Sequence, residues 1–170
     1  TRAAIEAKLQ TLEERLKQGL AHQSFVLLPG KKDQSAMWAA RKAATPLLFR
    51  RSDGLQPVAI VEDAAVPIDR LREYVEKMQK VFEKYKLEYS CYAHAGHGEP
   101  HFRPMLDLTK KEHVDLLEKI AGDCHAIVWA CDGTISGEHG EGLARAQWVE
   151  KQAGKELYEV FKQVKSLFDP

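Results

Sequence analysis

The sequence predicts an α+β fold in which helices pack on an antiparallel sheet. Short apolar runs bounded by proline or glycine alternate along the chain with longer segments of helical periodicity. Two of the predicted strands, at 87–96 and 101–106, are joined by a short glycine-containing stretch, as in an antiparallel pair. The 170 residues can form an apolar core, and no internal repeat or linker interrupts them. We therefore expect residues 1–170 to form a single domain.

The N-terminal part is predicted to contain two helices and a strand. Apolar residues at helical spacing predict a first helix that ends at Gly19. "SFVLLPG" (24–30) is a short apolar run ending in Pro-Gly, which is typical of a buried strand that enters a turn. A second helix is expected from Asp33, a good N-cap residue, to Pro46, which disfavours continuation.

The remaining elements follow from the same signals. "PVAIVEDAAVP" (57–67) predicts a strand bounded by prolines, and Pro67 lies near the start of a helix. This helix has one apolar stripe, formed by Ile68, Leu71, Val75, Met78 and Phe82. A long helix is expected at 109–131, with Thr109 as N-cap and Glu112 in the capping-box position. Two shorter helices are expected at 141–151 and 153–167.

Composition excludes several classes of protein. Apolar residues make up 44% of the chain and charged residues 29%, which is typical of a globular protein. Because 25 basic residues balance 25 acidic ones, no broad attraction to nucleic acid or acidic lipid is expected. No apolar run is long enough for a transmembrane segment, and the charged N-terminus lacks the apolar stretch of a signal peptide. Cys91, Cys124 and Cys131 lack CxxC spacing and predict reduced thiols of a cytoplasmic protein.

Four of the seven histidines fall in two short glycine-containing stretches, "HAGHGEPHF" (94–102) and "SGEHGEG" (136–142). Imidazole and carboxylate are the usual ligands of Zn²⁺, Mn²⁺ or Fe²⁺, and an open catalytic site typically has three protein ligands. His94 and His101 would lie on opposite faces of an uninterrupted strand, but the glycines and proline between them allow convergence. The clustering predicts a metal site. The alternative for any single histidine is a solvated polar residue of a loop.

Carboxylate and proton chemistry would come from the second stretch. Glu138 or Glu141 could supply a third ligand. His139 follows Glu138 directly, so that one side chain can face a metal while the other faces a substrate. An imidazole beside a metal-held hydroxyl is a suitable general base at neutral pH. The alternative for His139 is a hydrogen bond to the backbone at a helix N-terminus.

Two arginines are candidates for binding a carboxylate substrate. Arg103 lies two positions beyond His101 and would share its face of a strand, where a bidentate pair with a carboxylate could form. Arg41 lies within a predicted helix and, taken alone, is typical of a surface arginine that covers Trp38.

The two stretches, together with "WAARKAATP", "VEDAAVP" and the terminal "VKSLFDP", resemble the C-terminal domain of FAD-linked oxidases. This group of the vanillyl-alcohol oxidase superfamily includes D-lactate dehydrogenase, glycolate oxidase and D-2-hydroxyglutarate dehydrogenase. Its pattern is close to H-x-G-D-G-N-x-H, then S-G/A-E-H-G-x-G, then K-x-x-F-D-P. The resemblance runs in order from about residue 36 to residue 170, and "HFRPMLDL" is most similar to the branch fused to iron–sulfur modules.

The resemblance implies a ferredoxin-like domain on the substrate side of a larger flavoenzyme, whose FAD is held mainly by a separate N-terminal domain. The enzyme would oxidise a D-2-hydroxy acid to a 2-oxo acid. By position, the divalent-metal ligands would be His94, His101 and Glu138, and the catalytic base would be His139. Substrate contacts would come from Arg41, Thr45 and Arg103. The sequence does not identify the electron acceptor.

Four positions depart from the family pattern. His97 stands where the pattern has aspartate, and Glu99 where it has asparagine. Arg103 replaces a smaller polar residue, and Val61 falls where some members have lysine. His97 could therefore be an additional metal ligand, and the charge of the pocket differs from that of its relatives.

Two other functions use the same residues. A metal-dependent hydrolase could activate water with the histidines and the glutamate, and it would need no flavin. A binding module without enzymatic activity could hold a structural metal with four protein ligands.

Overall fold

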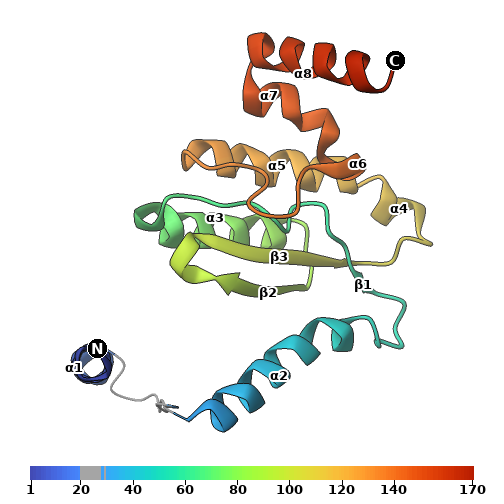
Figure 1. The fold of residues 1–170 in the computed structure, drawn as a ribbon. Helices are drawn as coiled ribbons and strands as arrows, with labels where there is room; N and C mark the ends of the chain where they lie inside the picture. The colour runs from blue at the N-terminus through green and yellow to red at the C-terminus, as the bar shows by residue number, and fades with distance from the viewer. Residues whose placement is uncertain (20–27, 29) are drawn as a thin grey trace. The chain divides into compact units, whose positions relative to one another are not determined.

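The computed structural model describes residues 1–19, 28 and 30–170, apart from the side chain of Thr45 (Figure 1). The strand predicted at 24–30 lies almost entirely outside the described residues. The chain divides into two compact units, Thr1–Leu47 and Leu48–Pro170, which are described separately.

The first unit contains two helices, α1 (Arg2–Gly19) and most of α2 (Lys31–Leu48). Helix α1 ends at the predicted glycine. The predicted N-cap of α2 is wrong, because the Gly30 carbonyl accepts the first helical hydrogen bond, from the N–H of Gln34, and Asp33 lies in the first turn. Helix α2 also continues past Pro46 to Leu48. A proline this close to the C-terminus removes a single hydrogen bond and leaves most of the helix unaffected.

The second unit is built on a three-stranded antiparallel sheet with the order β1-β3-β2. The strands are β1 (Gln56–Pro57), β2 (Tyr89–His94) and β3 (Glu99–Leu106). Strand β3 is buried along nearly its whole length because it lies in the middle. The predicted α+β fold with an antiparallel sheet is confirmed, and the order β1, α3, β2, β3, α5 follows the first five elements of the ferredoxin-like pattern.

The strand predicted at 57–67 is wrong beyond Pro57. After β1 the segment leaves the sheet, and its later residues pair in two directions. Ala65 forms an isolated antiparallel bridge with Thr134, and the N–H of Val66 donates to the Gly98 carbonyl at 2.9 Å. The segment therefore connects the β2–β3 hairpin to the loop that follows α5.

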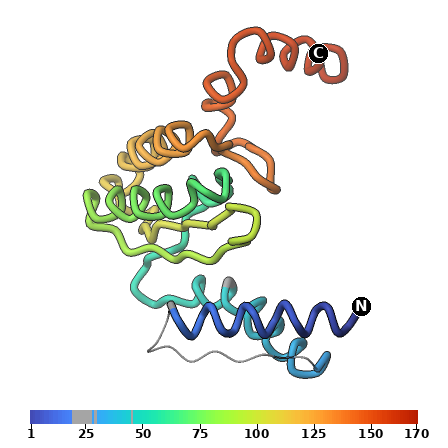
Figure 2. Tube along the Cα trace, turned by 90° about the vertical axis from the view of Figure 1, so that its left-hand side faces the viewer, coloured from blue at the N-terminus to red at the C-terminus, as the bar shows by residue number. Residues whose placement is uncertain are grey.

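Helices α3 (Leu71–Lys84) and α5 (Leu117–Ala130) pack together on one face of the sheet (Figures 1 and 2). A short 3₁₀ turn, η1 (Ile68–Arg70), precedes α3. The core joins the buried side of α3 to β3, with the Tyr74 and Phe102 ring centroids 6.0 Å apart. Met78 and Phe82 of the predicted stripe are fully buried, whereas Ile68 is exposed.

The helix predicted at 109–131 is divided into α4 (Lys111–Val114) and α5. Thr109 does not cap it, because the Thr109 hydroxyl donates to Asp107 and Lys110 occupies the N-cap position. The C-terminal part contains α6 (Gly142–Arg145), η3 (Ala146–Trp148), α7 (Val149–Ala153) and α8 (Lys155–Phe168). Within the described ranges, no helix combines the length and apolarity needed to cross a membrane.

Candidate active site

The β2–β3 hairpin brings His94 and His101 together. Tyr92 pairs with His101 across the hairpin, and His94 lies two residues beyond Tyr92, so the two histidines share one face of the sheet. Their ring centroids are 5.2 Å apart. The turn requires Gly98, because its φ of 70° is left-handed and a Cβ there would overlap the Val66 carbonyl oxygen. The convergence predicted from the glycine-containing turn is present in the structure.

A fully buried carboxylate, that of Asp63, holds the loop that carries Glu138 and His139. It accepts hydrogen bonds from the Ser136 hydroxyl at 2.5 Å and from the N–H groups of Gly137, Glu138 and His139 at 3.1, 3.2 and 3.0 Å. Burial opposes ionisation, but these hydrogen bonds hold the pKa of Asp63 below its usual range. One side chain thus satisfies the backbone of a loop that is neither helix nor strand, and fixes both site residues.

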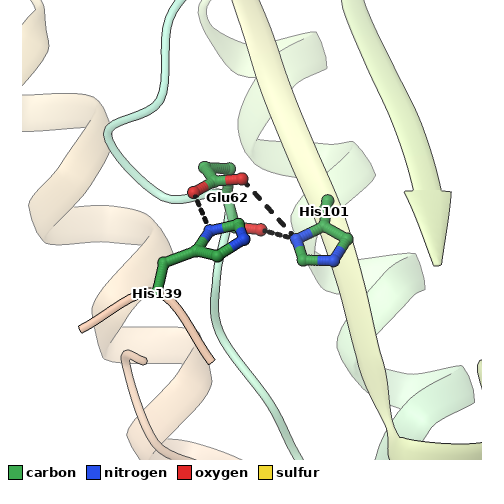
Figure 3. Close-up of side chains that lie close together, drawn as sticks. All are labelled: Glu62, His101 and His139. Carbon is green, nitrogen blue, oxygen red and sulfur yellow. Dashed lines mark hydrogen bonds and ion pairs between the residues drawn. The ribbon is translucent and has the colours of Figure 1, made fainter. Parts of the chain in front are cut away.

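Glu62, the neighbour of Asp63, contacts His101 and His139 (Figure 3). Its backbone carbonyl accepts a hydrogen bond from His101 Nδ1 at 2.7 Å, and its carboxylate Oε1 accepts one from His139 Nδ1 at 2.7 Å. Arg103 Nη2 donates to Oε2 at 3.0 Å. Burial opposes ionisation of Glu62, but the hydrogen bonds from His139 and Arg103 lower its pKa, while the same contact with Glu62 raises the pKa of His139.

Among the described residues, two overlapping sets offer three ligand atoms within 4.8 Å of one another: His94 with His101 and Glu138, and Glu62 with His101 and His139. The hydrogen bonds distinguish the two sets. In the second, the ring nitrogens that face Glu62 are Nδ1 atoms that donate to Glu62 and therefore carry protons. In the first, the Nε2 atoms of His94 and His101 lie 3.4 and 3.6 Å from Glu138 Oε1, and the Nδ1–H donated by His101 leaves its Nε2 lone pair free. The first set therefore fits a divalent metal.

The candidate ligands differ in exposure. The side chain of His101 is 1% exposed, whereas those of His94, Glu138 and His139 are 37%, 48% and 41% exposed. The Nε2 atom of His139 lies 3.4 Å from Glu138 Oε1, so the predicted base is next to the predicted ligands. Two of the three candidate ligands and the predicted base are therefore accessible from solvent.

Two arginines, the partly buried Arg103 and the buried Arg145, balance the charges of Glu62 and Asp63. Arg103, on β3, lies on the same face as His101, as predicted, but its side chain is 13% exposed and is paired with Glu62. Arg145, in α6, lies 3.6 Å from Asp63 Oδ2 and also donates to the Gly140 carbonyl. The substrate contact of Arg103 stays a prediction, and it would have to form beside the existing ion pair.

The other predicted substrate residues lie in the first unit. Arg41 is in α2, with its guanidinium carbon 5.8 Å from the centre of the Trp38 ring, as expected for a surface arginine that covers a tryptophan. Thr45 is also in α2, and its side chain lies outside the described residues. The roles of both residues at the site stay predictions.

The two unusual residues of the first stretch lie in different environments. His97 is exposed in η2 (Ala95–His97), with its ring centroid 6.3 Å from that of His94, and it belongs to neither ligand set. Glu99 pairs with His94 across the hairpin and is buried, with Oε1 against Gly137 and without a hydrogen-bond partner in the described part of the chain. The additional-ligand role of His97 stays a prediction.

Glu62, Asp63 and Arg145 were not identified as site residues from the sequence. The available signal was the pair of adjacent acids between apolar residues in "VAIVEDAAV". In a half-buried strand such a pair would place one carboxylate on each face, and in this structure both are buried.

A family model described as FAD linked oxidases, C-terminal domain, matches residues 1–170. The D-2-hydroxyglutarate dehydrogenase of Haemophilus influenzae is 34% identical over 134 residues, which cover 79% of this chain and 13% of that protein. The enzyme of the same name from Escherichia coli is 30% identical over 176 residues, covering 99% of this chain and 17% of that protein. Glycolate oxidase subunit GlcD of Bacillus subtilis is 29% identical over 166 residues, covering 98% and 34%. The chain thus spans from 13% to 34% of the length of these relatives.

Proposed function

The chain belongs to the family of FAD-linked oxidase C-terminal domains, and from this membership we propose that it is the substrate-side domain of a flavoenzyme. The proposed reaction is the oxidation of a D-2-hydroxy acid to a 2-oxo acid, since the similar proteins include D-2-hydroxyglutarate dehydrogenases and D-lactate dehydrogenases. FAD, held mainly by an FAD-binding domain of the same parent protein, supplies the hydride acceptor.

The proposed metal ligands are His94, His101 and Glu138. Two imidazole nitrogens and one carboxylate suit Zn²⁺, Mn²⁺ or Fe²⁺, and three protein ligands leave room for a substrate hydroxyl. When bound, such a metal lowers the pKa of a coordinated hydroxyl. The close approach of the three ligand atoms, together with the free Nε2 of His101, supports this set over the one that contains Glu62.

The proposed catalytic base is His139. Its Nδ1–H donates to Glu62, which leaves the Nε2 lone pair to accept the proton of the substrate hydroxyl. This nitrogen lies 3.4 Å from Glu138 Oε1, so a hydroxyl held beside Glu138 would also be next to the base. The substrate carboxylate would be bound by Arg41 and Thr45, with help from Arg103.

Two further features of the parent protein are part of the proposal. Iron–sulfur modules would be fused to it, on the strength of the "HFRPMLDL" resemblance alone. A cytoplasmic location is supported by three free cysteines, one of which is exposed.

Family membership supports the proposed reaction, and the juxtaposition of His139 with the ligand set is the single structural observation that carries the proposed mechanism. Its test is anaerobic flavin reduction by D-2-hydroxyglutarate, D-lactate and glycolate, followed as loss of flavin absorbance in the full-length holoenzyme. We expect at least one substrate to bleach the flavin, and His139→Ala to slow that step by roughly 10²–10⁴-fold. His101→Ala should lose activity together with bound metal. Absence of bleaching with all three acids, or a wild-type rate in His139→Ala, would contradict the proposal.

A further inference from the structure

We propose that Glu62 is a positioning residue of the active site, which fixes the imidazoles of the base and of one metal ligand from a single point on the chain. The inference rests on the function proposed above, because it assigns a role through His139 and His101. It concerns which nitrogen of each ring faces the substrate.

The carboxylate of Glu62 is held in one orientation. Its Oε1 accepts the His139 Nδ1–H at 2.7 Å, and its Oε2 accepts from Arg103 at 3.0 Å. The side chain is 5% exposed, so water does not compete for either oxygen. Because each oxygen has a partner in a different direction, the carboxylate cannot rotate without breaking one of two charge-assisted hydrogen bonds.

The backbone of the same residue orients the second ring. The Glu62 carbonyl accepts only a proton, so His101 must carry hydrogen on Nδ1 and keep its lone pair on Nε2. The ionised carboxylate imposes the same tautomer on His139. The two rings lie stacked, with centroids 5.4 Å apart and planes within 18°. Their Nε2 atoms lie 3.6 and 3.4 Å from the same atom, Glu138 Oε1.

One residue thus aligns a predicted ligand nitrogen and a predicted base nitrogen on a common point. A His–carboxylate pair of this kind keeps the imidazole in the tautomer that accepts a proton at Nε2, and changing the carboxylate to an amide permits the other tautomer. The alternative is that Glu62 is itself a metal ligand, as the second set of three would allow. That alternative requires Glu62 Oε1 to give up its hydrogen bond with His139, whose Nδ1 would have to lose its proton to bind a metal.

The test is anaerobic single-turnover flavin reduction in the full-length holoenzyme at saturating Mn²⁺. Glu62→Gln keeps the shape and permits the wrong tautomer of His139. Glu62→Asp keeps the charge for Arg103 but shortens the reach to His139 by one carbon. We expect both variants to slow flavin reduction at saturating substrate by roughly 10²-fold, with the substrate concentration for half-maximal rate nearly unchanged. Asp123→Asn is the matched control. It removes an ion pair with Lys84 and a hydrogen bond from Tyr85, neither of which is a site residue, and it should keep the wild-type rate.

The double variant Glu62→Gln/His139→Ala separates positioning from a merely structural role. If Glu62 acts through His139, the double variant is no slower than His139→Ala alone. The inference is overturned if the rate loss of the double variant is the product of the losses of the two single variants. It is also overturned if both Glu62 variants keep the wild-type rate while His139→Ala is impaired. Bound Mn²⁺ is measured in each variant, and loss of metal from Glu62→Gln would instead assign Glu62 as a ligand. An unimpaired His139→Ala would overturn the proposed function itself. If Glu62→Gln does not fold, the same measurements on Glu62→Asp test the inference.

Discussion

The two halves of the candidate site are built in different ways. His94 and His101 lie on the β2–β3 hairpin, where strand register and a glycine turn set their positions. Glu138 and His139 lie on a loop without helix or strand, and their positions are set by the buried carboxylates of Glu62 and Asp63. The hairpin half depends on local backbone geometry. The loop half depends on charged hydrogen bonds between residues more than 70 positions apart in the chain.

This difference predicts different sensitivities to substitution. A strand pair has many hydrogen bonds in its ladder, so one change is shared among several contacts. The loop is held mainly by the side chains of Asp63 and Glu62. A buried carboxylate that has lost its charge leaves several backbone donors and a buried arginine poorly paired.

The largest effect on stability is therefore expected for Asp63→Asn. The amide keeps one acceptor but turns an N–H₂ group toward the backbone donors of the loop. It also removes one of the two counter-charges of Arg145 and leaves only the Glu62 carboxylate, 3.8 Å away. We expect a loss of about 3–5 kcal/mol in the free energy of unfolding, measured by urea titration of the chain with tryptophan fluorescence. Asp123→Asn is the control, because Asp123 also accepts charged and hydroxyl hydrogen bonds but is partly exposed, and it should cost less than about 1 kcal/mol. Equal losses in the two variants would contradict the importance assigned to the buried carboxylate.

The same contrast explains what the sequence could and could not predict. The hairpin, the meeting of His94 with His101, and the shared face of His101 and Arg103 follow from local patterns of glycine and alternation, and all are present. The pairing of Asp63 with the loop is a contact across the chain, and no local pattern encodes it. The apolar run around Glu62 resembled a strand, which concealed that both adjacent acids are buried.

The predicted helix boundaries at 109–131 are wrong for a related reason. Thr109 is of a residue type that favours the N-cap position, but its hydroxyl donates a hydrogen bond to Asp107 and the helix starts later. The division of the predicted 109–131 helix after Val114 is accompanied by no glycine or proline that would have indicated it. Competition among short-range polar partners decides such ends, and spacing alone does not reveal the outcome.

An intermediate effect is expected for alanine at the hairpin turn. Gly98→Ala must place a side chain at a positive φ and against the Val66 carbonyl, so we expect a loss of about 2–4 kcal/mol in unfolding free energy. In the loop half, Gly140 also has a positive φ, 73°, but a Cβ added there would have no neighbour within 4 Å. Gly140→Ala should therefore lower the free energy of unfolding by only about 1 kcal/mol. Gly96→Ala has room and no positive φ, so its unfolding curve should overlay the wild type. A Gly140→Ala loss as large as that of Gly98→Ala would show that strain, and not the close approach, sets the hairpin cost.

The smallest predicted effect is a loss of folding stability at acidic pH. It concerns the packing of the segment that follows the loop. Trp148 follows α6 and packs on His125 of α5, with ring centroids 5.2 Å apart. His125 is fully buried, and burial, with Arg145 and Lys151 nearby, lowers its pKa to about 4. The folded chain therefore keeps His125 neutral, while the unfolded chain binds a proton there below its ordinary pKa of about 6.5. Because the unfolded state binds more protons between these two values, stability should fall as pH falls from about 6.5 to about 4.

His125→Leu removes this titration while keeping an apolar side chain against Trp148. The pH dependence of the wild type should exceed that of the variant by on the order of 1–3 kcal/mol across this window, measured as urea midpoints at each pH. At pH 7 the two chains should differ by less than about 1.5 kcal/mol, since neither ring nitrogen of His125 has a hydrogen-bond partner among the described residues. The carboxylates of Glu62 and Asp63 lose their stabilising contribution as pH falls from their ordinary pKa values, 4.5 and 3.8, toward their lowered ones, and this loss is common to both chains. If the urea midpoints of wild type and His125→Leu change in parallel between pH 4 and 6.5, the titration of His125 makes no contribution to stability at acidic pH.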